Sequence, residues 1–305
     1  MQTALIIANR AFEADPLVAV LANAAACPPG WPGFAQVNWP RIAAGQGAGP
    51  RCALVVSSTR VEVWCIQDLM DGTVPGGYSN TAEKARALKA IFAAAAGADA
   101  STPAAVIAFA TAAAPGTASF NGGVMLGRRA FVHKPYADSP DKSPSHWSAA
   151  GMMDVVLPSA FPGRAFDQLS TLTSPVQDIH ARLLAPPGVP ASDRRLVFEP
   201  AGVAVSSVNV VDHTQYAITD PAALAAANAG GALPVLSLET THGLIRTQSE
   251  APFLFVSGIA NRVGQYATED VPYPYVQDFV AAHNAAIALA WLLDWIIAVV
   301  ESNEA

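Results

Sequence analysis

The sequence predicts an α/β fold in which helices flank a mixed central sheet. Short apolar runs, each too short for a globular helix, alternate with stretches of helical spacing, as where Ala104–Ala110 follows Thr81–Ala96. Several of these runs end directly in polar residues, which is typical of buried strands in such sheets. The chain has 305 residues, with no internal repeat and no clean linker. We therefore expect one domain over residues 1–305.

Composition narrows the kinds of partner. Hydrophobic residues make up 52% of the chain and charged residues only 13%, so a large core and an ordered chain are expected. The formal net charge is −7, and the pI of about 5.3 is acidic. These values argue against a nucleic-acid backbone or an anionic membrane surface as the main partner. A small molecule is the expected ligand.

The cysteines and the absence of certain motifs limit the cellular compartment and the kinds of site that the sequence is expected to have. Cys27, Cys52 and Cys65 are an odd number without CxxC spacing, so neither a disulfide framework nor a zinc site is expected. The first residues lack a basic region and carry two acids after an apolar run, which favours a first strand over a secretion signal. The nucleoside-triphosphate motif GxxxxGK[ST], the dinucleotide motif GxGxxG, the α/β-hydrolase motif GxSxG and the zinc-protease motif HExxH are absent in usable contexts. We expect a cytoplasmic protein without a metal or cofactor.

The most apolar segment is Ala285–Val300. It is shorter than the roughly 20 residues that a spanning helix needs, and Asp294 lies inside it. We therefore predict a C-terminal helix packed on the sheet, and no membrane. If Trp291 and Trp295 are exposed on this helix, they form an oligomer interface, and a homo-oligomer is expected.

The amino-terminal sequence predicts a strand at Ala4–Ala8, followed by a turn and by a helix that includes Leu17–Leu21. Asp15 stands directly before Pro16, the arrangement of an N-cap followed by proline at the first helical position. Asp15 is thus either a helix cap or a functional acid of the turn.

A glycine-rich turn, Asp71–Asn80, leads into the helix Thr81–Ala96. Backbone N–H groups at a helix start attract anions, so Gly76 and Gly77 are candidates for holding phosphate, and Arg60 is the nearest basic residue. The alternative is an ordinary turn before a capped helix. Further elements are expected as a hairpin of Cys52–Ser57 with Arg60–Ile66, strands at Met125–His133, Arg195–Phe198 and Val203–Val211, and helical spacing over Ala165–Leu184.

The stretch from Leu233 to Gly264 concentrates the candidate site residues. Two apolar runs, Pro234–Leu238 and Phe253–Ile259, are each followed by polar residues. In α/β sheets the ligand crevice lies beyond the carboxyl ends of the strands. The polar residues expected there are Glu239, Thr240, Thr241 and His242 after the first run, and Asn261 and Arg262 after the second.

At this point the residues resemble a known family. The segment SLETTHGLIRTQSEAPFLFVSGIAN is similar to the ribose-binding and acid-bearing segments of the purine nucleoside phosphorylase and nucleosidase superfamily, in which Met-Glu ends one strand and Asp or Asn ends the next. Gly202–Val211 resembles the base-binding strand of that family. Ala4–Leu21 resembles its opening strand, turn and acidic helix start.

The resemblance implies an enzyme that cleaves the N-glycosidic bond of a purine ribonucleoside. It implies that Leu238 and Glu239 bind the ribose, that Asn261 donates to the departing base, and that Asp15 activates the attacking water, with Glu13 as the alternate holder of that role. Thr111 is implied to contact the nucleophile or the ribose. The base is implied to lie against Asn209, Val210 and Val211, although an aliphatic residue at Val210 cannot stack as an aromatic ring does.

Three readings of this resemblance remain open. The acidic turn around Glu13 and Asp15 is similar to the hydrolytic branch, the methylthioadenosine/S-adenosylhomocysteine nucleosidases, and favours hydrolysis that releases the free base. The second reading is a purine nucleoside phosphorylase that uses inorganic phosphate. The third is a non-catalytic nucleoside binder, since Ala112–Ala114 replace the glycines of the family and Asn261 stands in place of an acid.

Overall fold

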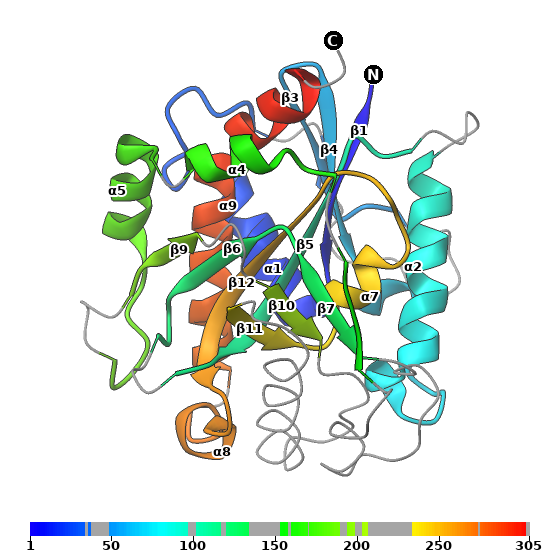
Figure 1. Cartoon of the computed structure of the whole chain (residues 1–305), viewed down its shortest axis with the longest axis vertical. Coiled ribbons are helices and arrows are strands. Elements are labelled where there is room, and N and C mark those ends of the chain that lie inside the picture. The colour runs from blue at the N-terminus through cyan, green and yellow to red at the C-terminus, as the bar shows by residue number, and fades with distance from the viewer. Residues whose placement is uncertain are drawn as a thin grey trace.

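Figure 1 shows the computed structural model of the chain. The structure describes most of the chain, with gaps between the described ranges. These ranges are residues 1–33, 36–37, 49–96, 102–116, 120–133, 153–157, 160–169, 171–189, 194–198, 203–206, 234–273 and 275–302.

Strands and helices alternate along these ranges. The strands are β1 (Thr3–Ala8), β2 (Gln36–Val37), β3 (Cys52–Val56), β4 (Thr59–Cys65), β5 (Ala105–Ala114), β6 (Val124–Gly127), β7 (Ala130–His133), β8 (Met153–Leu157), β9 (Leu196–Phe198), β10 (Val203–Ser206), β11 (Val235–Glu239) and β12 (Phe253–Arg262). The helices are α1 (Ala11–Ala22), α2 (Thr81–Ala96), α4 (Gly163–Leu169), α5 (Thr173–Arg182), α7 (His242–Arg246), α8 (Tyr266–Glu269) and α9 (Val276–Ser302), with short 3₁₀ turns η1 (Ile66–Leu69) and η2 (Gly77–Ser79).

The described strands form one mixed sheet of twelve strands, in which β5 is central. The main path runs β2-β3-β4-β1-β5-β11-β10-β7-β8, and β12, β6 and β9 branch from β5. β5 pairs in parallel with β1 and β12, and antiparallel with β11. The predicted α/β class with a mixed sheet is confirmed. The carboxyl ends of β1 and β12 point toward the bottom of Figure 1, where the first turns of α1, α2 and α9 also lie.

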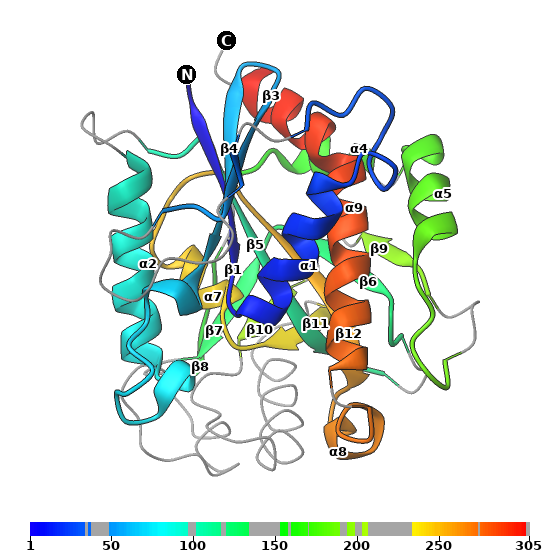
Figure 2. The same ribbon diagram turned by 180° about the vertical axis from the view of Figure 1, so that it is seen from behind.

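Helices cover both faces of the sheet, which explains why the strands read as continuous apolar runs. Figure 2 shows α1 and α9 on one face, and Figure 1 shows α7 on the other, with α2 beside it. Side chains of a strand alternate between the two faces. In β1, Ala4, Ile6 and Ala8 join the core under α1 and α9, while Leu5 and Ile7 join the core on the side of α2 and α7.

The C-terminal helix α9 packs on the sheet, as the sequence predicts, but it begins nine residues earlier, at Val276. By length and composition alone α9 is apolar enough to cross a membrane, and about three fifths of its most apolar window is buried within this fold. It packs directly against Gly258 of β12. A Cβ placed on Gly258 would lie 2.0 Å from the carbonyl oxygen of Ala281, so only glycine permits this contact.

Two predicted elements are each divided in the structure. The single strand expected over Met125–His133 is two strands, β6 and β7, which pair with different neighbours because the chain turns at Arg128 and Arg129. The helical stretch from Ala165 is two helices, α4 and α5, since Pro175 is tolerated only in the first turn of a helix and α5 restarts two residues before it.

Candidate active site

The central strand β5 brings the two candidate strand ends together. In the sheet register, Ala113 of β5 lies opposite Leu238 on one side and opposite Asn261 on the other. Glu239 and Asn261 therefore flank the carboxyl end of β5. The two strands do not run as parallel neighbours, as a simple α/β sheet would have them. β11 is antiparallel to β5, but it reaches the same end because it pairs there through one residue only.

Glu13 lies at the centre of this edge and is buried, with 2% of its surface exposed. One carboxylate oxygen accepts hydrogen bonds from the backbone N–H (2.7 Å) and the hydroxyl (3.0 Å) of Thr111. The other accepts from the N–H of Arg10 at 2.8 Å, just before helix α1. This bond satisfies a donor at the helix start, which is why α1 begins at Ala11. Helix capping and site geometry thus depend on the same carboxylate.

The surroundings of Glu13 favour proton uptake. Burial raises the pKa of its carboxyl group, and this effect exceeds the opposing hydrogen bonds from Thr111 and Arg10 and the attraction of Arg10. A carboxylate with a raised pKa is a stronger base than an exposed one. A raised pKa of this kind is what a carboxyl group needs to act as a general base.

Asp15 does not share this environment. It lies inside α1 rather than at its N-cap, so the predicted cap at Asp15 with Pro16 as first helical residue is wrong. Residues two apart in an α-helix point about 200° apart, which turns Asp15 away from Glu13. Its carboxylate is half-exposed and pairs with Arg51, which also binds Asp68 at 2.9 Å. Asp15 is thus engaged in an ion pair away from this edge, whereas the alternate residue Glu13 lies at it.

Glu239 is buried and held firmly at the end of β11. One of its oxygens accepts from the backbone N–H groups of Thr241 and of His242, the latter at 2.7 Å, so it caps the short helix α7. His242 is stacked on Phe255 and lies 3.0 Å from the hydroxyl of Ser257. His242 is fully buried and serves this packing. The capping bonds orient the Glu239 carboxyl group.

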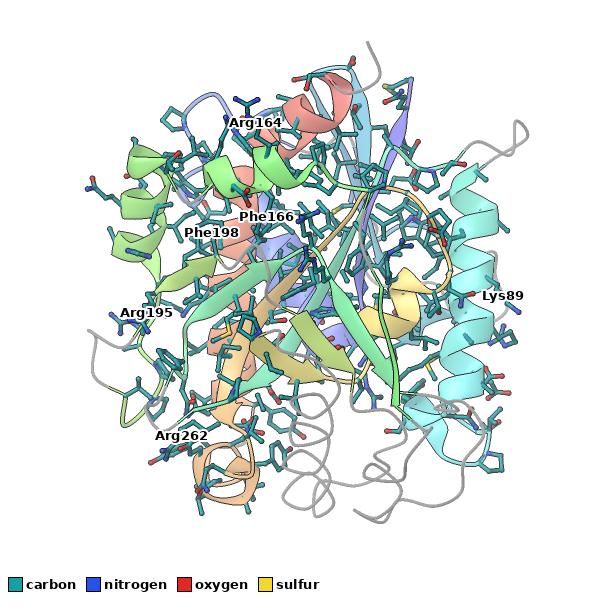
Figure 3. The ribbon with its side chains drawn as sticks, in the orientation of Figure 1. Lys89, Arg164, Phe166, Arg195, Phe198 and Arg262 are labelled. Carbon is teal, nitrogen blue, oxygen red and sulfur yellow. The ribbon has the colours of Figure 1, made fainter. Side chains whose placement is uncertain are left out.

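Asn261 occupies the end of β12, where the register shifts beside β5. It is buried, and its side-chain N–H donates to the backbone carbonyl of Arg262 at 2.7 Å. Arg262 forms an ion pair with Glu269, and its backbone N–H donates to the carboxylate of Glu269 at 2.8 Å. Figure 3 shows Arg262 at the foot of β12 beside α8. The amide of Asn261, not the guanidinium of Arg262, belongs to the site.

Two polar residues of the site escape the sequence analysis, Asn9 and Lys84. Both donate to the hydroxyl of Thr240, the former at 3.3 Å and the latter at 3.1 Å. Lys84 comes from α2 and is 4% exposed. Burial lowers the pKa of its ammonium group to about 8, assisted by Arg10 and opposed by Glu239 and Glu13.

Signals for both missed residues exist in the sequence. Asn9 is the first polar residue after the predicted strand Ala4–Ala8. Lys84 shares a helix face with Ala87, Leu88 and Ile91, which are all buried. A lone lysine on the apolar face of a helix is unusual enough to mark a site.

An acidic group on α9 also faces this region. Burial raises the pKa of Asp278 to about 7, and repulsion from Asp270 and from Glu13 adds to the shift. Asp270 is buried and receives a hydrogen bond from the hydroxyl of Tyr266. Asp278 stands three residues before Ala281, which packs on Gly258, and its charge interacts with that of Glu13.

The candidate phosphate residues do not converge. Arg60 lies at the amino end of β4, opposite Thr3 of β1, and pairs with Glu62. It therefore lies at the amino edge of the sheet, away from the edge that carries Glu13, Glu239 and Asn261. Gly76 and Gly77 lie nearer the site, because Arg10 donates to Ser79 of the same turn at 3.1 Å. The N–H of Gly77 is already used within the turn by the carbonyl of Val74.

The remaining predicted residues divide into two groups. Thr111 and Leu238 lie at the same edge as Glu13, although Thr111 is inside the long strand β5 rather than after it. The predicted base-binding residues Asn209, Val210 and Val211 lie outside the described residues.

Solved structures share this architecture. The chain superposes on the 5′-methylthioadenosine/S-adenosylhomocysteine nucleosidase of Neisseria meningitidis, in complex with methylthio-immucillin-A, with a TM-score of 0.53 and 13% identity over 97% of this chain and 100% of that one. It superposes on the S-adenosylhomocysteine nucleosidase of Streptococcus pyogenes, in complex with 5-methylthiotubericidin, with a TM-score of 0.54 and 12% identity over 96% of each chain. The chain has the nucleoside phosphorylase and nucleosidase fold. No protein-family model matches the sequence, and no curated protein matches it.

The likeness therefore lies in the fold, and the chemistry has to be argued from the residues. On this nucleosidase-type fold, the edge formed by the carboxyl ends of β1, β5, β11 and β12 gathers the buried carboxyl groups of Glu13 and Glu239 and the carboxamide of Asn261, with the buried ammonium of Lys84 reaching it from α2. Such a set can bind a polar ring-bearing ligand and activate water.

Proposed function

We propose that the protein is a nucleosidase that hydrolyses the N-glycosidic bond of a purine ribonucleoside and releases the free base. The observation that carries the proposal is the buried carboxylate of Glu13, which Thr111 and Arg10 hold at the edge where Glu239 and Asn261 meet. Glycoside hydrolysis needs an oxocarbenium-like transition state stabilised by nearby negative charge, a placed water, and a donor at the leaving group.

Each of these requirements has a residue. Glu13 takes the proton of the attacking water, in place of Asp15. Glu239, oriented by the N–H groups of α7, accepts hydrogen bonds from the ribose hydroxyls, with Leu238 beside it. Asn261 donates to the departing base. Asn209, Val210 and Val211 remain the proposed surroundings of the base.

Hydrolysis is preferred to phosphorolysis on grounds of charge. A phosphate site needs surplus positive charge or several convergent N–H groups. In the described part of the site, the ammonium of Lys84 and the guanidinium of Arg10 are matched by the carboxyl groups of Glu13 and Glu239. Arg60 is distant from them. The solved nucleosidases with the same fold support the same choice.

The deciding experiment incubates the purified protein with adenosine, inosine, guanosine, 5′-methylthioadenosine and S-adenosylhomocysteine, and measures free base by chromatography. We expect base release without phosphate, with free sugar as the second product. Release that requires phosphate and yields a sugar 1-phosphate would establish the phosphorylase instead. Binding without release would establish a non-catalytic binder.

Asn261 is proposed to set the base preference. A carboxylic acid can supply a proton to N7 of an adenine while its other oxygen accepts from the 6-amino group, whereas an amide cannot supply that proton at neutral pH. The Asn261→Asp variant is therefore expected to raise the ratio of adenosine to inosine cleavage by about tenfold, the usual worth of one hydrogen bond. The ratio of the two kcat/KM values measures this. An unchanged ratio in the variant would assign Asn261 to turn closure alone.

We also propose a cytoplasmic homo-oligomer. Trp291 and Trp295, the expected contact residues, are partly buried within the chain, since Trp291 donates to Ala26 and Trp295 packs on Phe161. Several exposed apolar residues lie instead just before and at the start of α9, where Tyr275 is 80% and Phe279 50% exposed. An exposed patch of this kind is typical of a subunit contact. Light scattering of the purified chain would test it, and a monomer would refute it.

A further inference from the structure

Lys84 is placed where a cation is costly. Its neighbours on the inner face of α2 are Ala87, Leu88 and Ile91, and the residue is almost wholly buried. Removing an ammonium group from water costs several kcal/mol unless charge or hydrogen bonds compensate. Within the described residues, its one side-chain hydrogen bond is to Thr240. A lysine kept under these conditions has a use beyond folding.

The bonds of Thr240 show which groups remain for a ligand. A hydroxyl has two lone pairs and one hydrogen. Because the ammonium of Lys84 and the side-chain N–H of Asn9 both donate to it, the Thr240 hydroxyl accepts twice, and its own hydrogen is left for the hydroxyl of Thr241, 3.1 Å away. Thr240 is thereby saturated.

Unused hydrogen-bonding capacity is left on either side of Thr240. In the described part of the chain, Lys84 retains two N–H donors, and the side-chain oxygen of Asn9 is buried with no donor to it. A buried acceptor without a partner costs about 1–3 kcal/mol, so a ligand that supplies a donor is favoured there.

A ligand group that fits between these two side chains accepts a hydrogen bond from Lys84 and donates one to the side-chain oxygen of Asn9. An alcohol does both, whereas an ionised carboxylate only accepts and would place its oxygen against the oxygen of Asn9. The charged groups facing Lys84 are Arg10 from the turn after β1, Glu13 from α1 and Glu239 from β11. Their charges cancel that of Lys84, so the surroundings do not attract an anion.

We propose that Lys84 and Asn9, fixed by Thr240, form a subsite for one hydroxyl of the sugar and make the enzyme specific for ribonucleosides over their deoxy analogues. Thr240 directly follows Glu239, so the subsite adjoins the carboxyl group assigned to the ribose. This inference rests on the proposed nucleosidase function. Lys84 is a substrate-positioning residue and takes no part in proton transfer at the glycosidic bond.

The test compares a ribonucleoside with its 2′-deoxy and 3′-deoxy analogues in the wild type, Lys84→Met, Lys84→Arg and Lys89→Met. Methionine keeps the length of the side chain and removes its charge and donors. Lys89 is the matched control, because it lies on the same helix but is exposed and points away from the sheet (Figure 3). The substrate is the most active one found in the nucleoside panel.

For Lys84→Met we expect kcat/KM on the ribonucleoside to fall about 10- to 100-fold, the worth of a hydrogen bond to a charged group. For the deoxy analogue that lacks the hydroxyl bound by Lys84, kcat/KM should change less than threefold between the wild type and Lys84→Met. The preference of the wild type for the ribonucleoside over this analogue should therefore disappear in the variant. We expect the kcat/KM of the wild type to fall as the pH rises past about 8, because the ammonium of Lys84 then loses its proton. This fall should be absent in Lys84→Met. Lys84→Arg should retain part of the discrimination, and Lys89→Met all of it. The Tm of Lys84→Met should equal or exceed that of the wild type.

Equal losses on the ribonucleoside and both deoxy analogues, or no loss on any, would overturn the subsite while leaving the nucleosidase intact. Calorimetric binding of the same three compounds gives the same comparison if turnover is absent. A wild type that neither cleaves nor binds any nucleoside would overturn the proposed function and the subsite together.

Discussion

Replacement of Glu13 by glutamine is expected to lower kcat/KM for nucleoside cleavage by about 10²- to 10⁴-fold, the usual contribution of a general base. Glutamine has the same shape and keeps an oxygen for the hydrogen bonds from Thr111, but it cannot take a proton from water. Free base released per unit time, at saturating and at low substrate, separates a loss of kcat from a loss of binding. We expect the loss in kcat.

Asp15→Asn is the matched control, since it removes the same charge from the same helix. Arg51 keeps its bond to Asp68 in this variant, so activity should stay within about threefold of the wild type. The pH profile adds a second check. A base works only when ionised, so wild-type activity should fall as the pH drops through the pKa of Glu13, which lies above 4.5. Retention of activity in Glu13→Gln together with its loss in Asp15→Asn would return the role to Asp15.

Gly258→Ala is expected to destabilise the fold by about 3 kcal/mol, at the upper end of overpacking costs. The added Cβ would meet the backbone carbonyl of Ala281 at 2.0 Å, and a backbone atom cannot rotate away as a side chain does. Helix α9 would have to move off β12. Because α9 also carries Asp278, the charge near Glu13 would change with it.

Urea unfolding of the wild type, Gly258→Ala and Gly49→Ala measures this cost. Gly49 is the control, since a Cβ there meets no atom within 4 Å. The midpoint should fall for Gly258→Ala and stay constant for Gly49→Ala. Equal midpoints for all three proteins would show that α9 relaxes easily, and that its contact with β12 does not hold the site together.

The sequence alone determined the class of fold and most of the central strands. Buried parallel strands are apolar on both faces, so β1, β5 and β12 appear as short apolar runs whatever their order in the sheet. Polar residues directly after such runs are expected at the ligand edge, which is why the sequence predicts that Glu239 and Asn261 lie at the same edge of the sheet, as they do. Turns between short strands leave a weaker signal, and the break between β6 and β7 was missed for that reason.

Tertiary structure decided which of the two acids near the amino terminus belongs to the site. A proline after an acid is a good helix start by local rules, and this favoured Asp15. The helix begins earlier, where Glu13 caps it through Arg10, and the same carboxyl group is fixed against β5 by Thr111, which lies 98 residues away in the sequence. No local pattern contains that bond.

Tertiary structure likewise decided which basic residues lie near the ligand edge of the sheet. Arg60 is close to the glycine-rich turn in sequence, but the parallel pairing of β4 with β1 carries it to the amino edge of the sheet. Lys84 lies in an alanine-rich helix with no motif around it, and it reaches Thr240 across 156 residues of sequence. The side chains of an active site come from separate strands and helices, and only the packing of those elements brings their charges within reach of one another.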